Sequence, residues 1–225
     1  MATEVLALLK AHPVFSCLDE ASLLSLAELA LVRRCAADEF LVFAGDRWPY
    51  LFLVAEGSIL ALKESSEGRS LIVAEIGAGE VFWGVAFFET EMPNPVTLRC
   101  REMTKLYLWQ GEEIRPLLLA NGRLTWELAR AMVRRMLRAS EVIEGLAFQP
   151  VAGRLARLLL EQAPPDRQSL PRSLTLDELA ARLGTSREVV CRTLYRFAGE
   201  GLINITRTEF TLTDRDGLAR LLERT

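Results

Sequence analysis

Charged side chains recur on one face of a predicted helix over residues 187–197. Arg187, Glu188, Arg192 and Arg196 point away from the apolar side of that helix. An arginine can donate two hydrogen bonds to guanine O6 and N7, and a glutamate can accept one from cytosine N4. Arginines are also common on solvated surfaces, so the elements that hold the helix decide between the two interpretations.

The segment Thr175–Ile203 predicts two short amphipathic helices joined by a tight turn. The apolar face of the first consists of Leu176, Leu179, Ala180 and Leu183. Gly184 supplies the positive backbone angle that ends this helix, and Ser186 occupies the N-cap position of the second. The buried side of the second consists of Val189, Val190, Leu194 and Phe197. This pattern is typical of a helix-turn-helix, whose second helix enters a DNA major groove.

The residues after the helix pair favour a DNA-binding module over an ordinary all-α domain. Gly199, Glu200 and Gly201 end the second helix. Leu202–Thr213 then alternates in polarity and is rich in β-branched residues, which predicts a β-hairpin. A helix pair with a two-stranded wing is a winged helix-turn-helix. Before the pair, residues 163–173 predict a loop.

Composition narrows the class of protein. The 225 residues are enough for one or two domains, each with its own core. The sequence has no apolar run of 18 residues and no signal-peptide pattern, so we expect a cytoplasmic protein with no membrane partner. Residues 112–225 hold 18 Lys and Arg against 15 Asp and Glu, whereas residues 1–111 hold 9 against 15. The basic excess therefore lies in the half that carries the helix pair.

Cysteine and histidine usage argues against metal and catalytic chemistry. The four cysteines are scattered, which disfavours a CxxC zinc site or a clustered iron–sulfur site and favours reduced thiols. His12 is the only histidine, which almost excludes a histidine-based triad, and we expect it at the surface. No nucleophile–base pair is visible, so we expect a protein that is not an enzyme, and its cofactor is unknown.

The first half of the chain predicts two different regions. Residues 1–30 have helical spacing of apolar residues, with Asp19 as a cap. From Val32 to Trp109 short apolar runs recur between turn signals at spacings of about ten residues, which predicts a β-barrel or jelly-roll sandwich. These runs are Phe40–Phe43, Tyr50–Val54, Ser58–Leu62 and Leu71–Ile76.

Residues 112–148 predict one long helix with an apolar seam at alternating steps of three and four. The seam consists of Ala129, Met132, Met136, Ala139, Ile143 and Leu146. Because no polar residue interrupts it, we expect the helix to pair with a copy of itself in a homodimer. Packing of the helix on its own domain is the alternative.

The order of these parts resembles that of the Crp/Fnr family of bacterial transcription regulators, from about Phe15 to Asp214. Three stretches carry the likeness. They are Gly79-Glu80 at the end of the barrel, Leu146-Ala147-Phe148 followed by Val151, Gly153, Arg154, Leu155 and Ala156 at the hinge, and Thr185-Ser186-Arg187-Glu188 followed by Arg192 at the helix pair. The resemblance implies a cyclic-nucleotide-binding-like β-roll, a long dimer helix and a DNA-binding domain.

For the DNA-binding domain, the resemblance implies roles for five residues. Arg187, Glu188 and Arg192 would read bases, and Thr185 and Ser186 would donate hydrogen bonds to phosphate oxygens. A simple capping carboxylate is the alternative role of Glu188. The implied partners are double-stranded DNA with a palindromic operator, a second copy of the chain and RNA polymerase.

The sensor departs from the cyclic-AMP-binding pattern of the family. There a Gly-Glu pair is followed by an Arg-Ser pair, in which the arginine neutralises the cyclic phosphate. Here Glu80 matches, but the arginine position falls at Asn94-Pro95 and the next arginine is Arg99. A phosphate taken from water without a cationic partner is costly, so we expect an effector other than cyclic AMP.

The remaining ligand residues are assigned by the same resemblance. Ser140 matches an adenine-contacting serine, while Ala139 replaces its threonine neighbour. The candidate contacts are Glu80, Phe82, Trp83, Asn94 and Ser140. Two alternatives stay open, a haem held by His12 or a cysteine, and an apolar pocket. The aromatic residues that would line such a pocket are Trp83, Phe87, Phe88 and Trp126.

We therefore expect an α+β protein with an N-terminal β-roll, a long dimerisation helix and a C-terminal winged helix-turn-helix. The predicted divisions are residues 1–111, 112–148 and 149–225. The expected function is sequence-specific transcription regulation by a homodimer. A ligand-binding regulatory module that docks protein rather than DNA is the alternative.

Overall fold

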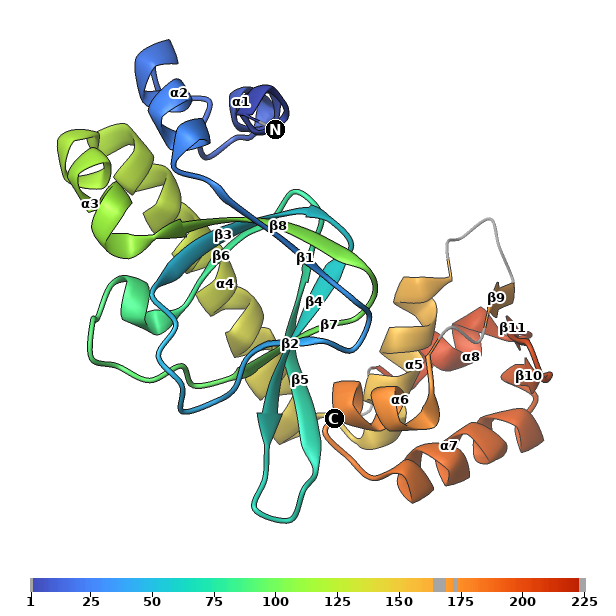
Figure 1. The fold of residues 1–225 in the computed structure, drawn as a ribbon. Coiled ribbons are helices and arrows are strands. Elements are labelled where there is room, and N and C mark those ends of the chain that lie inside the picture. The colour runs from blue at the N-terminus through green and yellow to red at the C-terminus, as the bar shows by residue number, and fades with distance from the viewer. Residues whose placement is uncertain (1, 164–168, 172–173, 223–225) are drawn as a thin grey trace. The chain divides into compact units, whose positions relative to one another are not determined.

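The computed structural model describes residues 2–163, 169–171 and 174–222. The chain divides into two compact units, each with its own core. The first comprises Met1–Lys63 with Val73–Arg138, and the second comprises Glu64–Ile72 with Ala139–Thr225. Helices and antiparallel sheets occur in both, which confirms the predicted α+β class (Figure 1).

Two short helices open the first unit. Helix α1 spans Ala2–Ala11 and α2 spans Glu20–Glu28. Asp19 caps α2 as predicted, because its carboxylate accepts the backbone N–H of Ser22 at 2.8 Å. Their apolar faces join the core that lies against the first sheet of the β-roll.

The β-roll consists of two four-stranded antiparallel sheets (Figure 1). The first has the order β1-β8-β3-β6, with bounds Leu31–Cys35, Thr104–Gln110, Tyr50–Glu56 and Val81–Trp83. The second has the order β2-β7-β4-β5, with bounds Phe40–Val42, Thr97–Cys100, Ser58–Glu64 and Ser70–Gly77. Apolar side chains of both sheets fill the space between them, as the predicted short strands require.

Two helices follow the roll where the sequence predicts one. A 3-10 turn, η1, spans Val85–Phe87, helix α3 spans Gly111–Ala120 and α4 spans Gly122–Phe148. The single helix predicted over 112–148 is wrong at Asn121, whose backbone is extended (φ −118°, ψ 91°). Asn121 Oδ1 accepts the N–H of Leu124 at 3.0 Å, so this side chain begins a new helix in place of continuing the old one.

The second unit contains the helix pair and the wing. Its helices are α5 (Val151–Gln162), α6 (Leu176–Leu183), α7 (Arg187–Gly199) and α8 (Arg215–Arg220). The predicted hairpin forms β10 (Ile203–Ile205) and β11 (Glu209–Leu212). A third strand, β9 (Ser169–Pro171), pairs with β11 inside the segment predicted as a loop, and residues 164–168 and 172–173 of that segment lie outside the described residues.

Three further findings concern the described residues alone. None of their helices is long and apolar enough to cross a membrane. Within that part of the chain no group of three or more His, Cys, Asp or Glu side chains could hold a metal ion. All four cysteines are free thiols.

Candidate nucleic-acid interface and sensor site

The turn between α6 and α7 has the geometry that its residues predict. Gly184 adopts the left-handed conformation (φ 60°, ψ 42°) and ends α6. Ser186 is extended and its hydroxyl accepts the N–H of Val189 at 3.4 Å, so it caps α7. Thr185 lies between them, and its N–H donates to the backbone carbonyl of Ala180 at 3.0 Å. The start of α7 is therefore fixed by the left-handed backbone of Gly184, the Thr185 hydrogen bond to α6 and the Ser186 cap.

The outer face of α7 carries the charged residues that the sequence singles out. Arg187, Glu188 and Arg192 are all exposed. The guanidinium of Arg187 lies 3.4 Å from the carboxylate of Asp177 on α6, an exposed ion pair of little energetic weight. A hydrogen bond from Ser186 lowers the pKa of Glu188, which keeps that carboxylate an acceptor. The three side chains are thus available for hydrogen bonds to base edges.

Two exposed residues of this unit are not identified by the sequence reasoning. Tyr195 is 71% exposed on α7, one turn beyond Arg192 and on the same face. Arg207 is exposed in the turn between β10 and β11. Both positions follow from the predicted helix and hairpin, since residues i and i+3 share a helix face and a hairpin tip faces solvent.

Arg154 donates hydrogen bonds to carbonyl groups at the C-terminal ends of two helices. Its guanidinium donates to the carbonyl of Gly145 at 3.2 Å and of Gln149 at 2.5 Å, near the end of α4. It also donates to the carbonyl of Leu183 at 3.1 Å, at the end of α6. Burial lowers the pKa of Arg154, and the three carbonyls supply the negative dipole ends that a desolvated cation requires. This residue positions the helix pair relative to the end of α4.

The sensor candidates Glu80, Phe82 and Trp83 lie together where α4 passes the roll. Glu80 accepts the N–H of Gly77 at 2.9 Å and pairs with Arg138 at 3.1 Å. Arg135 stacks over the ring of Phe82, with its central carbon 4.5 Å from the ring centroid. The same guanidinium lies 5.7 Å from Trp83.

The half-buried Arg135 of α4 completes this cluster. Arg135 donates to the carbonyl of Val81 at 2.6 Å, and burial lowers its pKa to about 10, so it stays charged at neutral pH. Sequence reasoning missed both Arg135 and Arg138, since nothing local marks an arginine of α4 as a partner of a strand some 55 residues away. Two arginines of α4 therefore contact Glu80 and the β6 residues that follow it.

The other two ligand candidates are not brought to this cluster by any observed contact. Asn94 is 2% exposed, and its amide donates to the carbonyl of Val96 at 2.7 Å within its own turn. Ser140 is an exposed residue of α4 and belongs to the second unit. Arg99, the nearest arginine in sequence, lies 3.7 Å from Asp38. The expected phosphate position thus lacks a free cation among these residues.

The helix seam is exposed along much of its length. Met136 and Ile143 are 64% and 66% exposed, and Ala129 and Ala139 are also exposed. Met132 and Leu146 are half-buried. Val133, Leu137 and Trp126 extend the exposed apolar surface, and sequence reasoning did not include them. The exposed stripe is therefore broader than the predicted seam and is shifted toward Val133.

Comparison with known proteins identifies the family. Residues 32–121 match the model of the cyclic nucleotide-binding domain, and residues 153–221 match the Crp-like helix-turn-helix domain. The chain is 28% identical to the cAMP-activated global transcriptional regulator Vfr of Pseudomonas aeruginosa, over 77% of this chain and 85% of that protein. It is 27% identical to the cAMP-activated global transcriptional regulator CRP of Haemophilus influenzae, over 75% of this chain and 77% of that protein.

The chain belongs to the Crp/Fnr family. Solved structures share its fold. The c-di-GMP responsive global regulator CLP of Xanthomonas campestris has a TM-score of 0.77 at 23% identity, covering 86% of this chain and 99% of that one. A putative transcriptional regulator of the Crp/Fnr family from Eubacterium rectale has a TM-score of 0.79 at 21% identity, covering 94% of this chain and 98% of that one. The chain is therefore a DNA-binding transcription regulator with a cyclic-nucleotide-binding-like sensor domain.

His12 is buried, so its predicted surface position is wrong in this Crp/Fnr protein. It is 8% exposed because it packs beside Phe15, with ring centroids 5.2 Å apart. Its Nδ1 accepts the N–H of Val14 at 3.1 Å, so the neutral ring donates from Nε2 to the carbonyl of Gly79 at 2.9 Å. The histidine therefore holds the residue that precedes Glu80.

The buried histidine predicts a stability change with pH. Burial lowers the pKa of His12, and the Gly79 carbonyl opposes this only in part. Because the unfolded chain then binds the proton more tightly, the free energy of unfolding should fall as pH drops through about 6.5. Chemical denaturation between about pH 7.5 and 5 should show the slope, since His12 is the only histidine. The variant His12→Gln should flatten it, and an unchanged slope in that variant would contradict this assignment.

Proposed function

We propose that this chain regulates transcription as a homodimer that reads a palindromic operator with α7, under control of a β-roll effector other than cyclic AMP. The observation that carries the proposal is the exposed charged face of α7, held by Gly184 and Ser186 at the start of the helix. The proposed division is a sensor over residues 1–111, a dimerisation segment over 112–148 and a DNA-binding domain over 149–225. Its place of action is the cytoplasm.

The base-reading roles follow from chemistry and position. Arg187 and Arg192 offer paired donors for guanine, and Glu188 accepts from cytosine. Thr185 and Ser186 lie at the helix N-terminus, where phosphate oxygens are favoured. Arg207 at the wing tip serves as a further phosphate contact. By the family likeness, the half-site is a TGTGA-type box, with half-site centres about 10 bp apart. RNA polymerase is the proposed protein partner on the promoter.

The dimer is supported by the unpartnered apolar stripe of α4. Exposed Met136 and Ile143 would lose contact with water if two copies of the helix paired along this stripe. Such pairing also matches the two-fold symmetry of a palindromic site.

An effector other than cyclic AMP is supported by the state of the β6 cluster. Glu80 is already engaged by Arg138, and Arg135 is held by Phe82 and Val81. A cyclic phosphate would have to release one of these arginines or bind beside a carboxylate without a cation. The relatives described as cAMP-activated and as c-di-GMP responsive show that this fold serves more than one effector class.

A module that docks protein in place of DNA is the second candidate. It would use the same exposed arginines of α7. A salt titration of DNA binding separates the two, because phosphate contacts give a steep linear fall of log affinity with log salt. A chain with no DNA binding at low salt would favour the protein-docking function.

Charging the seam should break the dimer. In Met136→Glu two unpaired carboxylates would meet at the interface, at a cost of several kcal/mol. Light scattering at micromolar concentration should report a dimer for the natural chain and a monomer for this variant. Arg134→Glu, which reverses a charge on an exposed position of the same helix outside the seam, should stay dimeric. A monomeric natural chain would overturn the proposal.

Removing one base-reading side chain should affect specific binding alone. Arg187→Ala should cost roughly 1–3 kcal/mol on the operator recovered by selection from random DNA, and little on random duplex. Arg207→Ala is the matched control, since loss of a phosphate contact weakens both duplexes similarly and lowers the salt slope by about one. Equal losses on both duplexes for Arg187→Ala would reassign Arg187 to phosphate binding.

Cyclic AMP should not act on this protein. Calorimetry of the ligand-free chain with cyclic AMP should show no binding at micromolar concentration, because the phosphate position at Asn94-Pro95 offers no free cation. Operator affinity should likewise be unchanged by the nucleotide. A dissociation constant in the low micromolar range with tighter operator binding would show that Arg135 or Arg138 serves as a substitute cation.

A further inference from the structure

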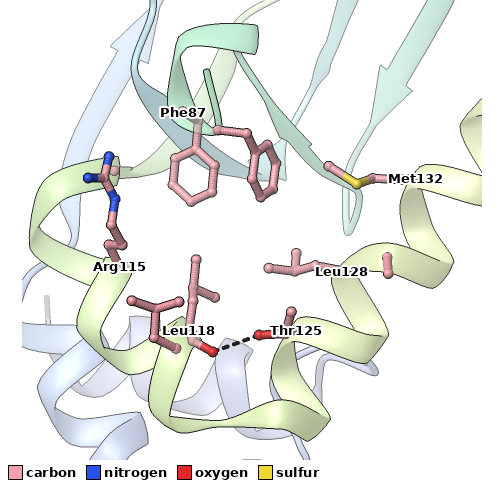
Figure 2. Close-up of a pocket in the computed structure, with 10 residues that line it drawn as sticks. Phe87, Arg115, Leu118, Thr125, Leu128 and Met132 are labelled. Carbon is pink, nitrogen blue, oxygen red and sulfur yellow. Dashed lines mark hydrogen bonds between the residues drawn. The ribbon is translucent and has the colours of Figure 1, made fainter. Parts of the chain in front are cut away.

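A cavity of about 260 Å³ lies between η1, α3 and the start of α4. Figure 2 shows side chains from these three elements around an open central space. Glu80, Phe82 and Trp83 do not line it, so it is distinct from the cluster on β6. The whole cavity belongs to the first unit.

The walls of this cavity are apolar. Phe87 and Phe88 form one wall, with ring centroids 4.7 Å apart in an edge-to-face arrangement. Leu118, Leu128 and Met132 close the other sides (Figure 2). A site with this lining favours a hydrocarbon chain or ring in its interior.

The only hydroxyl in the lining is already committed. Thr125 Oγ1 donates to the carbonyl of Leu118 at 2.7 Å, the bond drawn in Figure 2, and also approaches the carbonyl of Asn121 at 3.2 Å. Its proton therefore cannot serve a ligand, and the Thr125 hydroxyl does not select an anion. Another residue of the lining must therefore distinguish a charged ligand from a neutral one.

Arg115 is that residue. It is the only charged residue of the lining and stands on the side of the cavity opposite Met132 (Figure 2). The side chain is exposed, and no carboxylate of the described residues lies within ion-pair distance of it. A guanidinium at the mouth of an apolar cavity favours a ligand with one carboxylate head and an apolar body.

We propose that this cavity binds a medium-chain monocarboxylate, with the hydrocarbon tail between Phe87 and Leu128 and the carboxylate on Arg115. A dry cavity of about 150 Å³ holds benzene, so by proportion 260 Å³ holds about ten carbon atoms. A saturated ten-carbon acid fits this size with its head at the rim. The site is separate from the proposed DNA and cyclic-nucleotide chemistry, and its occupancy is measurable without either.

A second copy of the chain is the competing occupant. Ala129 and Met132 line the cavity and also belong to the proposed dimer seam. The tail site extends beyond them to Phe87 and Leu128, which are 4% and 3% exposed. A paired helix would cover the mouth on that side, while Arg115 stands on the other.

Calorimetry of the full-length chain with decanoate, decanol and decylamine tests the proposal. Decanoate should bind most tightly and decylamine least, because only the carboxylate complements Arg115. Octanoate should bind about 15-fold more weakly than decanoate, since each buried methylene contributes roughly fourfold in affinity. Equal affinities of decanoate and decanol, or no binding of decanoate to the natural chain, would overturn the site.

Two variants separate the head from the tail. Arg115→Gln should remove the preference for decanoate over decanol and leave decanol binding unchanged. Arg123→Gln, an exposed arginine at the start of α4 that does not line the cavity, should change neither. Leu118→Trp should fill the cavity and abolish binding of both ligands in a protein that still melts cooperatively. Decanoate binding that survives in a folded Leu118→Trp chain would place the ligand elsewhere.

Discussion

The orientation of α4 against the β-roll depends on one half-buried cation. The guanidinium of Arg135 exchanges part of its hydration for cation–π contacts with Phe82 and Trp83 and for a hydrogen bond to the carbonyl of Val81. Because side chains on a helix repeat every 3.6 residues, turning Arg135 inward also decides which residues turn outward. Met136 and Val133 then face solvent as part of the apolar stripe. A contact made inside one chain thereby prepares the surface that we assign to the dimer.

Local chemistry made much of the second unit predictable. The left-handed glycine, the capping serine and the alternating wing each act within a few residues, so their spacing in the sequence carries the information. The same holds for Asp19 before α2 and for the short strands of the roll. In these places the geometry follows from side chains and backbone groups that are neighbours in the chain.

The features that the sequence did not predict are of two kinds. Some depend on contacts between distant segments, and one depends on a side chain that is compatible with two local structures. His12 is buried because Gly79, 67 residues later, offers it a carbonyl, and neither segment marks the other. The break between α3 and α4 depends on Asn121, which can continue a helix or cap a new one. Periodicity could not separate these options, since the apolar spacing runs on past the break. Strand β9 likewise exists only because the edge of β11 accepts it.

The first unit therefore offers two sites of opposite character for an incoming signal. Beside β6, Glu80 already pairs with Arg138, and Arg135 is held by the Val81 carbonyl and the Phe82 ring, so a ligand there must replace strong contacts before it gains any. At the α3–α4 cavity, Arg115 has no partner carboxylate among the described residues, and the walls present apolar surface to a ligand. Binding in that cavity disturbs no ion pair and touches Ala129 and Met132 of the proposed seam directly. A ligand held there would act on helix pairing itself, without first dissolving the contact that orients the helix.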